Sequence, residues 1–383
     1  MYFKNTSLYF AYLSCLCLLF VGCDNNNKAR NISVSHGGEA FTIAPLDTRN
    51  LIDASDLLTN VKFVALQTNQ QSLISSIDKV ICVDDRYFVW DSKFQNVAIF
   101  DHSGEYLGKV GAIGKGPGEF LSIEDIKVSA DSAYLIILSN DSKKLLWYTL
   151  EGEFSKDMST GIWGSDFGVL NDDFYLYVNK NVSEKSRNYD LIQINENGSV
   201  EGRYFEFKNI QDISIGFAGF IHPNNTGLLY NPAFSDTVFQ IRSDLIYPKY
   251  TFDFGKKKKA ETNREFMDNY FDSDYDHLGK FFIETENGIL FSYKSGNVLS
   301  NMYCSLDFNT YSVKRKCDLT FPMNYVVGHH GNEIISYLPA DILVNNLNEE
   351  FMKKALESFP ELETMAKNIN NTDNPILISF AID

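Results

Sequence analysis

A short polar turn recurs along this chain at an almost constant interval, and that interval limits the folds the chain can adopt. In each copy an apolar segment runs into a polar turn that ends in glycine or aspartate. The turns end at Gly104, Gly152, Gly198 and Asp244, which lie 48, 46 and 46 residues apart. Alternating apolar segments broken by polar pairs fill the intervals, as expected for strands. A repeat of this length predicts an array of similar β units.

The first complete repeat indicates how many strands each unit contains. Four strand-like segments follow one another there: Val80–Val83, Arg86–Trp90, Asn96–Phe100 and Glu105–Val110. Four strands in a period near 46 are typical of one blade of a β-propeller. Residues 57–383 have room for about six such repeats once two helix-like stretches are set aside. We therefore predict an all-β fold, a six-bladed β-propeller of four-stranded blades; an array of β-sandwiches is the alternative.

Two helix-like stretches, residues 256–280 and 341–370, are expected as short helical insertions. The first opens on the four lysines 256–259, which favour a solvated helix start over a site for a polyanion. In the second, apolar residues at 351, 352, 355 and 356 share one helix face. That face would cover the centre of the propeller, dock a partner, or pack on its own blade.

A closed propeller must join its first and last blades, because an open ring would expose two strand edges. The segment Val61–Leu66 precedes the first full repeat, and Pro375–Ala381 ends the chain. We predict that these two segments pair in one blade.

The first 22 residues have the pattern of a signal peptide. The apolar run Leu8–Val21 is too short for a bilayer core, which needs about 20 residues. It ends in Gly22-Cys23, which resembles the lipobox of bacterial lipoproteins, with Cys23 as the lipidated residue. The chain is therefore predicted to be exported and anchored by lipid to an envelope membrane, expected to be the outer membrane. Residues 23–50 would be the tether and 51–383 the propeller; an ordinary signal peptide with a chance cysteine is the alternative.

Charge and cysteine content exclude some functions. The chain carries 34 basic and 50 acidic residues, a net charge of −16, which disfavours nucleic acid as a partner. Besides Cys23, the mature chain would keep Cys82, Cys304 and Cys317, and no two of them have zinc-site spacing. An envelope compartment permits a disulfide between Cys304 and Cys317, and buried free thiols are the alternative.

A glycine-rich loop between the first two repeats carries a family resemblance. The loop Gly114-Lys115-Gly116-Pro117-Gly118-Glu119-Phe120 resembles that of six-bladed β-propeller lipoproteins of Gram-negative anaerobes, and also NHL-like and TolB-like propellers. Further matches follow in order over about residues 50–383, at Ser55–Thr68, Ser235–Ile241 and Asp373–Leu377. The resemblance implies the fold and the envelope location more than any activity.

The physics of this loop favours a structural turn between blades over a ligand loop. Gly114, Gly116 and Gly118 allow close backbone approach, and Pro117 fixes one φ angle. Glu119 would hold the turn through backbone N–H groups. Phe120 would anchor it in the core. The Gly-Lys-Ser/Thr ending of a phosphate-binding loop is missing.

Four residues are candidates for the central funnel. His329 and His330 are adjacent, so in a strand they face opposite sides and make a poor catalytic dyad. His222 lies in a polar, turn-like stretch that is expected at a strand end near one mouth of the propeller, as a loop rather than a metal site. Trp163 could stack on a sugar or peptide, although a core anchor is the simpler interpretation.

The leading hypothesis is a non-enzymatic binding or protein-interaction propeller for a glycan, a peptide or an envelope protein. The alternative is a metal-assisted hydrolase or lactonase at the funnel. No nucleophile elbow or zinc-protease motif occurs, so no catalytic residue is assigned. No cofactor is predicted, and calcium at the axis belongs to the alternative.

Overall fold

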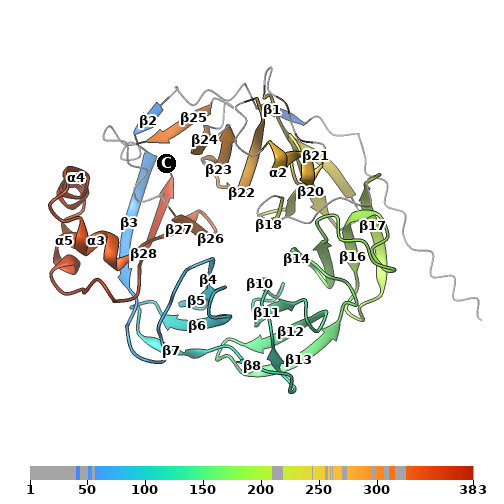
Figure 1. Ribbon diagram of the computed structural model, residues 1–383, viewed down its shortest axis with the longest axis horizontal. Helices are drawn as coiled ribbons and strands as arrows, with labels where there is room; N and C mark the ends of the chain where they lie inside the picture. The colour runs from blue at the N-terminus through green and yellow to red at the C-terminus, as the bar shows by residue number, and fades with distance from the viewer. Residues whose placement is uncertain are drawn as a thin grey trace, which may run out of the picture.

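The computed structural model is a ring of six small antiparallel sheets around a central axis (Figure 1). It describes residues 40–43, 51–53, 57–208, 219–243, 245–254, 258, 260, 262–269, 274–295, 298–305, 310–314 and 325–382. The all-β, six-bladed propeller expected from the repeat is confirmed.

Each blade has four antiparallel strands ordered from the axis outward, and in blades 1–5 these four are consecutive in the chain. Blade 1 is β4–β7, blade 2 β10–β13, blade 3 β14–β17, blade 4 β18–β21, blade 5 β22–β25, and blade 6 β26–β28 with β3. The strands of blades 1 and 2 are β4 (Lys79–Val83), β5 (Arg86–Asp91), β6 (Asn96–Asp101), β7 (Tyr106–Lys109), β10 (Asp125–Val128), β11 (Tyr134–Ser139), β12 (Lys144–Thr149) and β13 (Phe154–Ser159). Those of blades 3 and 4 are β14 (Asp166–Leu170), β15 (Asp173–Tyr177), β16 (Tyr189–Ile194), β17 (Val200–Glu206), β18 (Phe220–Asn224), β19 (Gly227–Asn231), β20 (Thr237–Arg242) and β21 (Leu245–Phe252). Those of blades 5 and 6 are β22 (Asp276–Glu284), β23 (Gly288–Ser295), β24 (Val298–Ser305), β25 (Thr310–Lys314), β26 (Val326–His330), β27 (Glu333–Leu338), β28 (Ile376–Ile382) and β3 (Leu58–Ala65).

The N-terminal part of the chain visits the rims of three successive blades. β1 (Phe41–Ile43) adds a parallel strand outside β21 of blade 4, and β2 (Leu51–Asp53) does the same outside β25 of blade 5. β3 then becomes the outermost strand of blade 6. The residues expected as a tether, 23–50, therefore include a strand of the propeller at 41–43, because the rim of blade 4 offers an unpaired edge.

Blade 6 closes the ring, and the predicted pairing of the two chain ends is confirmed. β3 pairs antiparallel with β28, with Ala65 opposite Ile376 and Phe63 opposite Ile378. The buried Asn374 side chain, just before β28, holds the segment that follows β3. Its oxygen accepts from the N–H of Ile74, and its nitrogen donates to the carbonyls of Gln67 and Ser72. One amide thus satisfies three backbone groups that lie about 300 residues away along the chain.

Two constraints require glycine at the repeated turn: a positive φ angle and a close contact with the preceding blade. Gly104, Gly152 and Gly198 have φ of +89°, +88° and +72°, and they end the turn between the third and fourth strands of blades 1, 2 and 3. A Cβ on each would lie 2.2, 2.5 and 2.3 Å from a carbonyl oxygen that ends the outer strand of the preceding blade, at Ala65, Lys109 and Ser159. The turn therefore also contacts the preceding blade. Because it occurs once in each blade, the spacing of the turns in the sequence equals the length of one blade.

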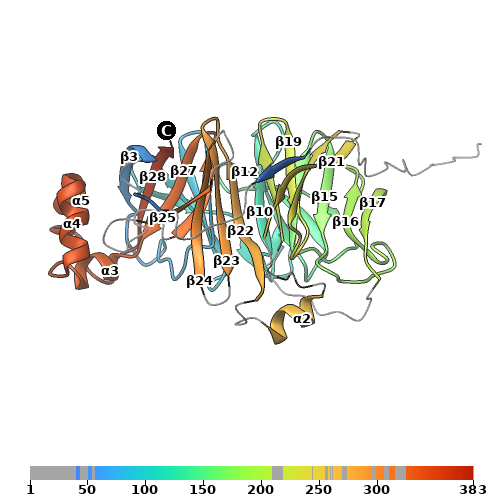
Figure 2. The ribbon, with the colours of Figure 1, turned by 90° about the horizontal axis from the view of Figure 1, so that it is seen from above.

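The helices lie outside the blade sheets. α2 (Asn263–Asp268), capped by the Thr262 hydroxyl, projects from one face of the propeller (Figure 2). The expected insertion at 256–280 was too long, because residues 276–280 are the start of the inner strand β22, where burial and pairing outweigh the polar sequence.

The second insertion forms three helices between β27 and β28. These are α3 (Ala340–Asn345), α4 (Glu350–Ser358) and α5 (Pro360–Ala366). They pack on the outer side of blade 6, where Phe359 meets Phe63 at 5.4 Å between ring centroids. The apolar face of this insertion therefore packs on its own blade and does not cover the axis (Figure 1).

Within the described part of the chain, Cys304 is buried and Cys82 is a half-buried free thiol. Cys23 and Cys317, with the predicted anchor and the predicted bridge, lie outside the described residues.

Candidate functional site

The blade topology places three kinds of segment on one face. The inner strands begin there, the linkers that enter each blade end there, and the turn between the second and third strands of each blade lies there. We call it the strand-start face. α2 emerges from it, in the linker between blades 4 and 5 (Figure 2).

Four charged side chains of the inner strands meet at the axis on this face. Lys79, Asp125 and Asp166 are the first residues of β4, β10 and β14, and Lys127 is the third residue of β10. We call these four residues the axial cluster. Neighbouring inner strands lie side by side around the axis, so residues from three blades reach one another (Figure 1).

Lys127 is the centre of the axial cluster. Its Nζ lies 3.0 Å from Asp166 Oδ1 and 3.3 Å from Asp125 Oδ2, and it donates to the carbonyl oxygen of Ile221 at 2.8 Å. Asp125 also accepts from Lys79, and Asp166 accepts from the N–H of Ile221 at 3.0 Å. The cluster therefore links blades 1, 2, 3 and 4 through two lysines and two aspartates.

The ionisation of the cluster follows from this geometry. Burial favours the neutral form of Asp166, but Lys127 and Lys79 outweigh burial and hold the pKa of Asp166 well below its usual value. Burial likewise opposes the charge on Lys127, but Asp125 and Asp166 raise the pKa of Lys127 above its usual value. Lys127 and Asp166 are thus an ion pair at neutral pH.

Two of the histidines proposed for the funnel lie beside this cluster. His222 is in β18, stacked on Phe220 at 4.8 Å, and its Nε2 lies 2.9 Å from the carbonyl oxygen of Lys280. Burial and then the charge of Lys127 hold the pKa of His222 well below its usual value. Burial also lowers the pKa of His329 in β26. Both rings are neutral near pH 7.

The stretch His222–Asn225 lies at a strand end, as expected, but it is less of a loop than its polar sequence suggests. His222, Pro223 and Asn224 are the last residues of the inner strand β18, and the turn begins at Asn225. Pro223 is tolerated because an inner strand has a neighbour in its sheet on one side only.

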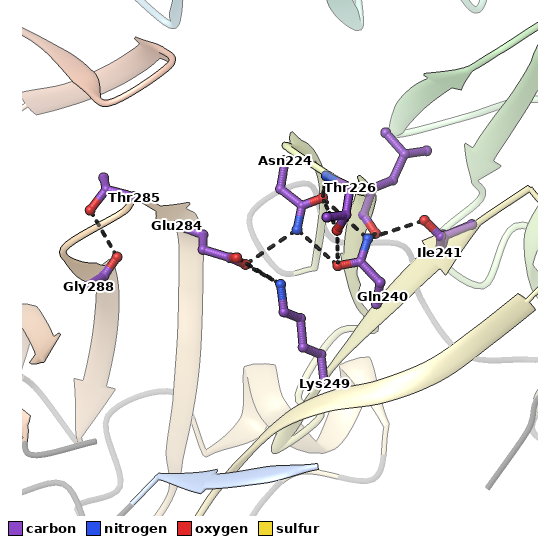
Figure 3. Close-up of polar contacts among 9 residues, drawn as sticks. Asn224, Thr226, Gln240, Ile241, Lys249, Glu284, Thr285 and Gly288 are labelled. Carbon is purple, nitrogen blue, oxygen red and sulfur yellow. Dashed lines mark hydrogen bonds and ion pairs between the residues drawn. The ribbon is translucent and has the colours of Figure 1, made fainter. Parts of the chain in front are cut away.

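Asn224 takes part in a junction between blades 4 and 5 (Figure 3). Its Nδ2 donates to Gln240 at 2.9 Å and to Glu284 at 3.3 Å, and Lys249 Nζ reaches the two Glu284 oxygens at 2.8 and 2.7 Å. These groups satisfy one another, so this polar network is structural.

In the glycine loop, too, polar groups bond to one another. The N–H of Gly116 donates to Glu119 Oε2 at 2.7 Å, and a Cβ on Gly114 would lie 2.0 Å from the same oxygen. Phe120 is buried edge-on against Tyr148. The loop opens and closes on the short parallel strands β8 (Ala112–Ile113) and β9 (Glu119–Phe120). Glu119 and Phe120 act as expected for a structural turn.

A groove of about 350 Å³ lies beside this loop on the strand-start face of blade 1. We call it the blade-1 groove. Leu73, Phe94 and Ile113 line it and are 46%, 52% and 60% exposed, a high exposure for large apolar side chains that share one site. The rest of the lining is Gln70, Gln71, Gln95, Asn96, Lys109, Val110, Gly111, Ala112 and Phe120.

The other two funnel candidates lie elsewhere. His330 is exposed at the end of β26. Trp163 is half-buried in the linker into blade 3, which Asn140 fastens by hydrogen bonds to Gly164 at 2.9 and 3.0 Å. Sequence reasoning missed the axial cluster. The sequence did contain a signal for it. The inner strands of blades 1, 2 and 3 each begin with a charged residue, at a position where the strand pattern predicts an apolar one.

The described residues lack two kinds of feature. They hold no group of three or more His, Cys, Asp or Glu placed to bind a metal ion. None of their helices is long and apolar enough to span a bilayer.

Comparisons with known proteins identify a family and a shared fold. The family model described as "Domain of unknown function (DUF4934)" matches residues 40–380. The crystal structure of a candidate exported protein, BF0058 of Bacteroides fragilis, superimposes with a TM-score of 0.69 at 17% identity, over 90% of this chain and 99% of that one. A member of the DUF4221 family from Bacteroides vulgatus gives a TM-score of 0.52 at 10% identity, over 85% and 97%. No curated protein matches the chain.

Proposed function

We propose that this chain, which belongs to the DUF4934 family, is an exported, lipid-anchored propeller that binds a ligand in the blade-1 groove without converting it. The observation that carries the proposal is the set of three exposed large apolar side chains, Leu73, Phe94 and Ile113, in one groove. Water-exposed apolar groups gathered in a concave site gain free energy when a ligand covers them.

The groove is supported by the rigid part of the fold. Phe120 in its wall is buried, and the adjoining turn is held by Glu119 and by the Tyr148 hydroxyl, which donates to the Gly118 carbonyl at 3.1 Å. Gln95 is fixed by hydrogen bonds to Ser92 and Ile123. A site held in place before binding loses little conformational entropy when the ligand arrives.

A variant of Phe94 tests this function. We expect Phe94→Ala to weaken binding about tenfold, because Phe94 is the one exposed aromatic ring among the lining residues and a ligand would cover it. The measurement is a screen of the protein on a glycan array and on a displayed heptapeptide library, followed by affinities for the enriched compounds by calorimetry. The matched control is Phe41→Ala, which removes an equally exposed ring, 50%, from the rim of blade 4.

Two results would count against a binding function at this groove. One is a screen that enriches no compound from either collection. The other is an enriched compound whose affinity is the same for the unaltered chain and for Phe94→Ala.

The anchor is supported by the leader and by Cys23. The apolar run of residues 8–21 and the Gly22-Cys23 pair are the features on which the proposal rests. We expect the full chain, made in a Gram-negative host, to enter the detergent phase of a Triton X-114 partition. Cys23→Ser should move it to the aqueous phase, because acyl chains supply most of the membrane affinity. Equal partition of both forms would rule out lipidation at Cys23.

A metal-assisted hydrolase is the less favoured function. Burial, and after it the charges of Lys127 and Lys79, lower the pKa of His222 and of His329. The same lysines oppose a divalent cation there, and they already occupy Asp125 and Asp166. The axial cluster is better suited to joining blades than to holding a metal.

A further inference from the structure

We propose that the ligand of the blade-1 groove is a short peptide that presents a carboxylate next to an apolar side chain. This inference rests on the proposed function and names its ligand class. Three properties of the lining point to this ligand: its charge, its apolar side chains and its amides.

The charge of the lining is opposite to that of the chain. The protein carries 50 acidic and 34 basic residues, yet the lining holds one lysine, Lys109, and no aspartate or glutamate. Lys109 is exposed, and no ion pair joins it to another described residue. An anionic group next to Lys109 would gain a charge-assisted hydrogen bond that the free protein does not make.

The apolar part of the lining favours a peptide over a glycan. Leu73 and Ile113 are aliphatic, and such side chains match an aliphatic or aromatic residue better than the hydroxyl-rich surface of a sugar. Phe94 is the one exposed ring among the lining residues, and no carboxylate is present to accept from sugar hydroxyls.

The remaining polar side chains suit a peptide backbone. Gln70, Gln71 and Asn96 carry amides that both donate and accept hydrogen bonds. A groove of about 350 Å³ is at the small end of the range for ligand sites, so it accommodates a short segment. The carboxylate has two sources, the C-terminus of a peptide or an acidic side chain next to an apolar residue.

The test compares peptides that differ in this carboxylate. The probes are fluorescent Gly-Gly-Ala-Leu and Gly-Gly-Ala-Phe, each as the free acid and as the C-terminal amide, with internal Leu-Glu and Leu-Gln peptides blocked at both ends. We expect the free acid, the Leu-Glu peptide or both to bind at least about tenfold more tightly than the uncharged partner. Tighter binding of the free acid than of the amide would show that the groove binds a C-terminal carboxylate. Tighter binding of Leu-Glu than of Leu-Gln would show that it binds an acidic side chain.

Variants of Lys109 separate this inference from the proposed function. Lys109→Gln should remove the preference for the carboxylate and keep the weaker binding of the amide, whereas Phe94→Ala should weaken both. Lys353→Gln, the same change on the exposed surface of α4, is the control. Equal affinity for acid and amide that Phe94→Ala still lowers would overturn the peptide carboxylate and leave the binding function standing. Glycan binding without peptide binding would overturn the peptide class.

Discussion

Replacing Lys127 with methionine is expected to lower the free energy of unfolding by about 3–5 kcal/mol, the range for breaking a buried ion pair from one side. Lys127 is 10% exposed, and it faces Asp166 at 3.0 Å and Asp125 at 3.3 Å. Methionine keeps the length of the side chain and removes the charge. The two carboxylates would then be left with Lys79 as their one remaining cation in the axial cluster. Urea unfolding followed by tryptophan fluorescence measures the loss.

Two further variants give this prediction a control and a rescue. Lys144→Met removes an ion pair with Asp157 whose side chains are 37% and 33% exposed, so it should cost about 0.5 kcal/mol or less. Lys127→Met combined with Asp166→Asn should recover part of the stability, because it leaves Lys79 paired with Asp125 and no surplus carboxylate. A cost for Lys127→Met no larger than that of Lys144→Met would show that the axial cluster does not join the blades.

The fold was predictable from the sequence because its repeat has a physical cause in every blade. The glycine at 104, 152 and 198 is fixed by a positive φ and by contact with the preceding blade, so the period of the turn is the period of the structure. Closure followed from the need to bury two strand edges. The strands β1 and β2 were not predictable, because three residues of alternating polarity carry too little pattern.

The candidate site was predictable only in part. The glycine loop was visible because glycine, proline and glutamate in that order constrain the backbone, and His222 and His329 were visible as rare residue types. Phe94 and Ile113 were not visible, because an exposed apolar residue in a strand-rich chain looks like a core residue until the burial is known. Lys127 was hidden for the opposite reason: a charged residue in a strand suggests exposure, and partners from other blades cannot be read from sequence.

Cross-linking the two strands of blade 6 is expected to raise the free energy of unfolding by about 4 kcal/mol. Lys62 on β3 and Ser379 on β28 are opposite each other in register. A disulfide between Lys62→Cys and Ser379→Cys would tie residues near the two ends of the propeller into one loop. The loss of chain entropy in the unfolded state grows with the length of that loop, so this site should give close to the largest gain a single disulfide provides. Denaturation of the oxidised and reduced forms measures it.

The comparison is internal, because the reduced double variant carries the same two substitutions and differs only in the bond. Both forms lack the exposed ion pair between Lys62 and Glu333, 3.5 Å in the unaltered chain, so its loss does not affect the difference in stability between them. Cys82 and Cys304 remain in the chain, so peptide mapping must show that the bond joins residues 62 and 379. If the bond forms and the stability stays the same, the two strands of blade 6 remain paired in the denatured chain. If it does not form, the pairing of β3 with β28 is wrong, and another pair of strands closes the ring.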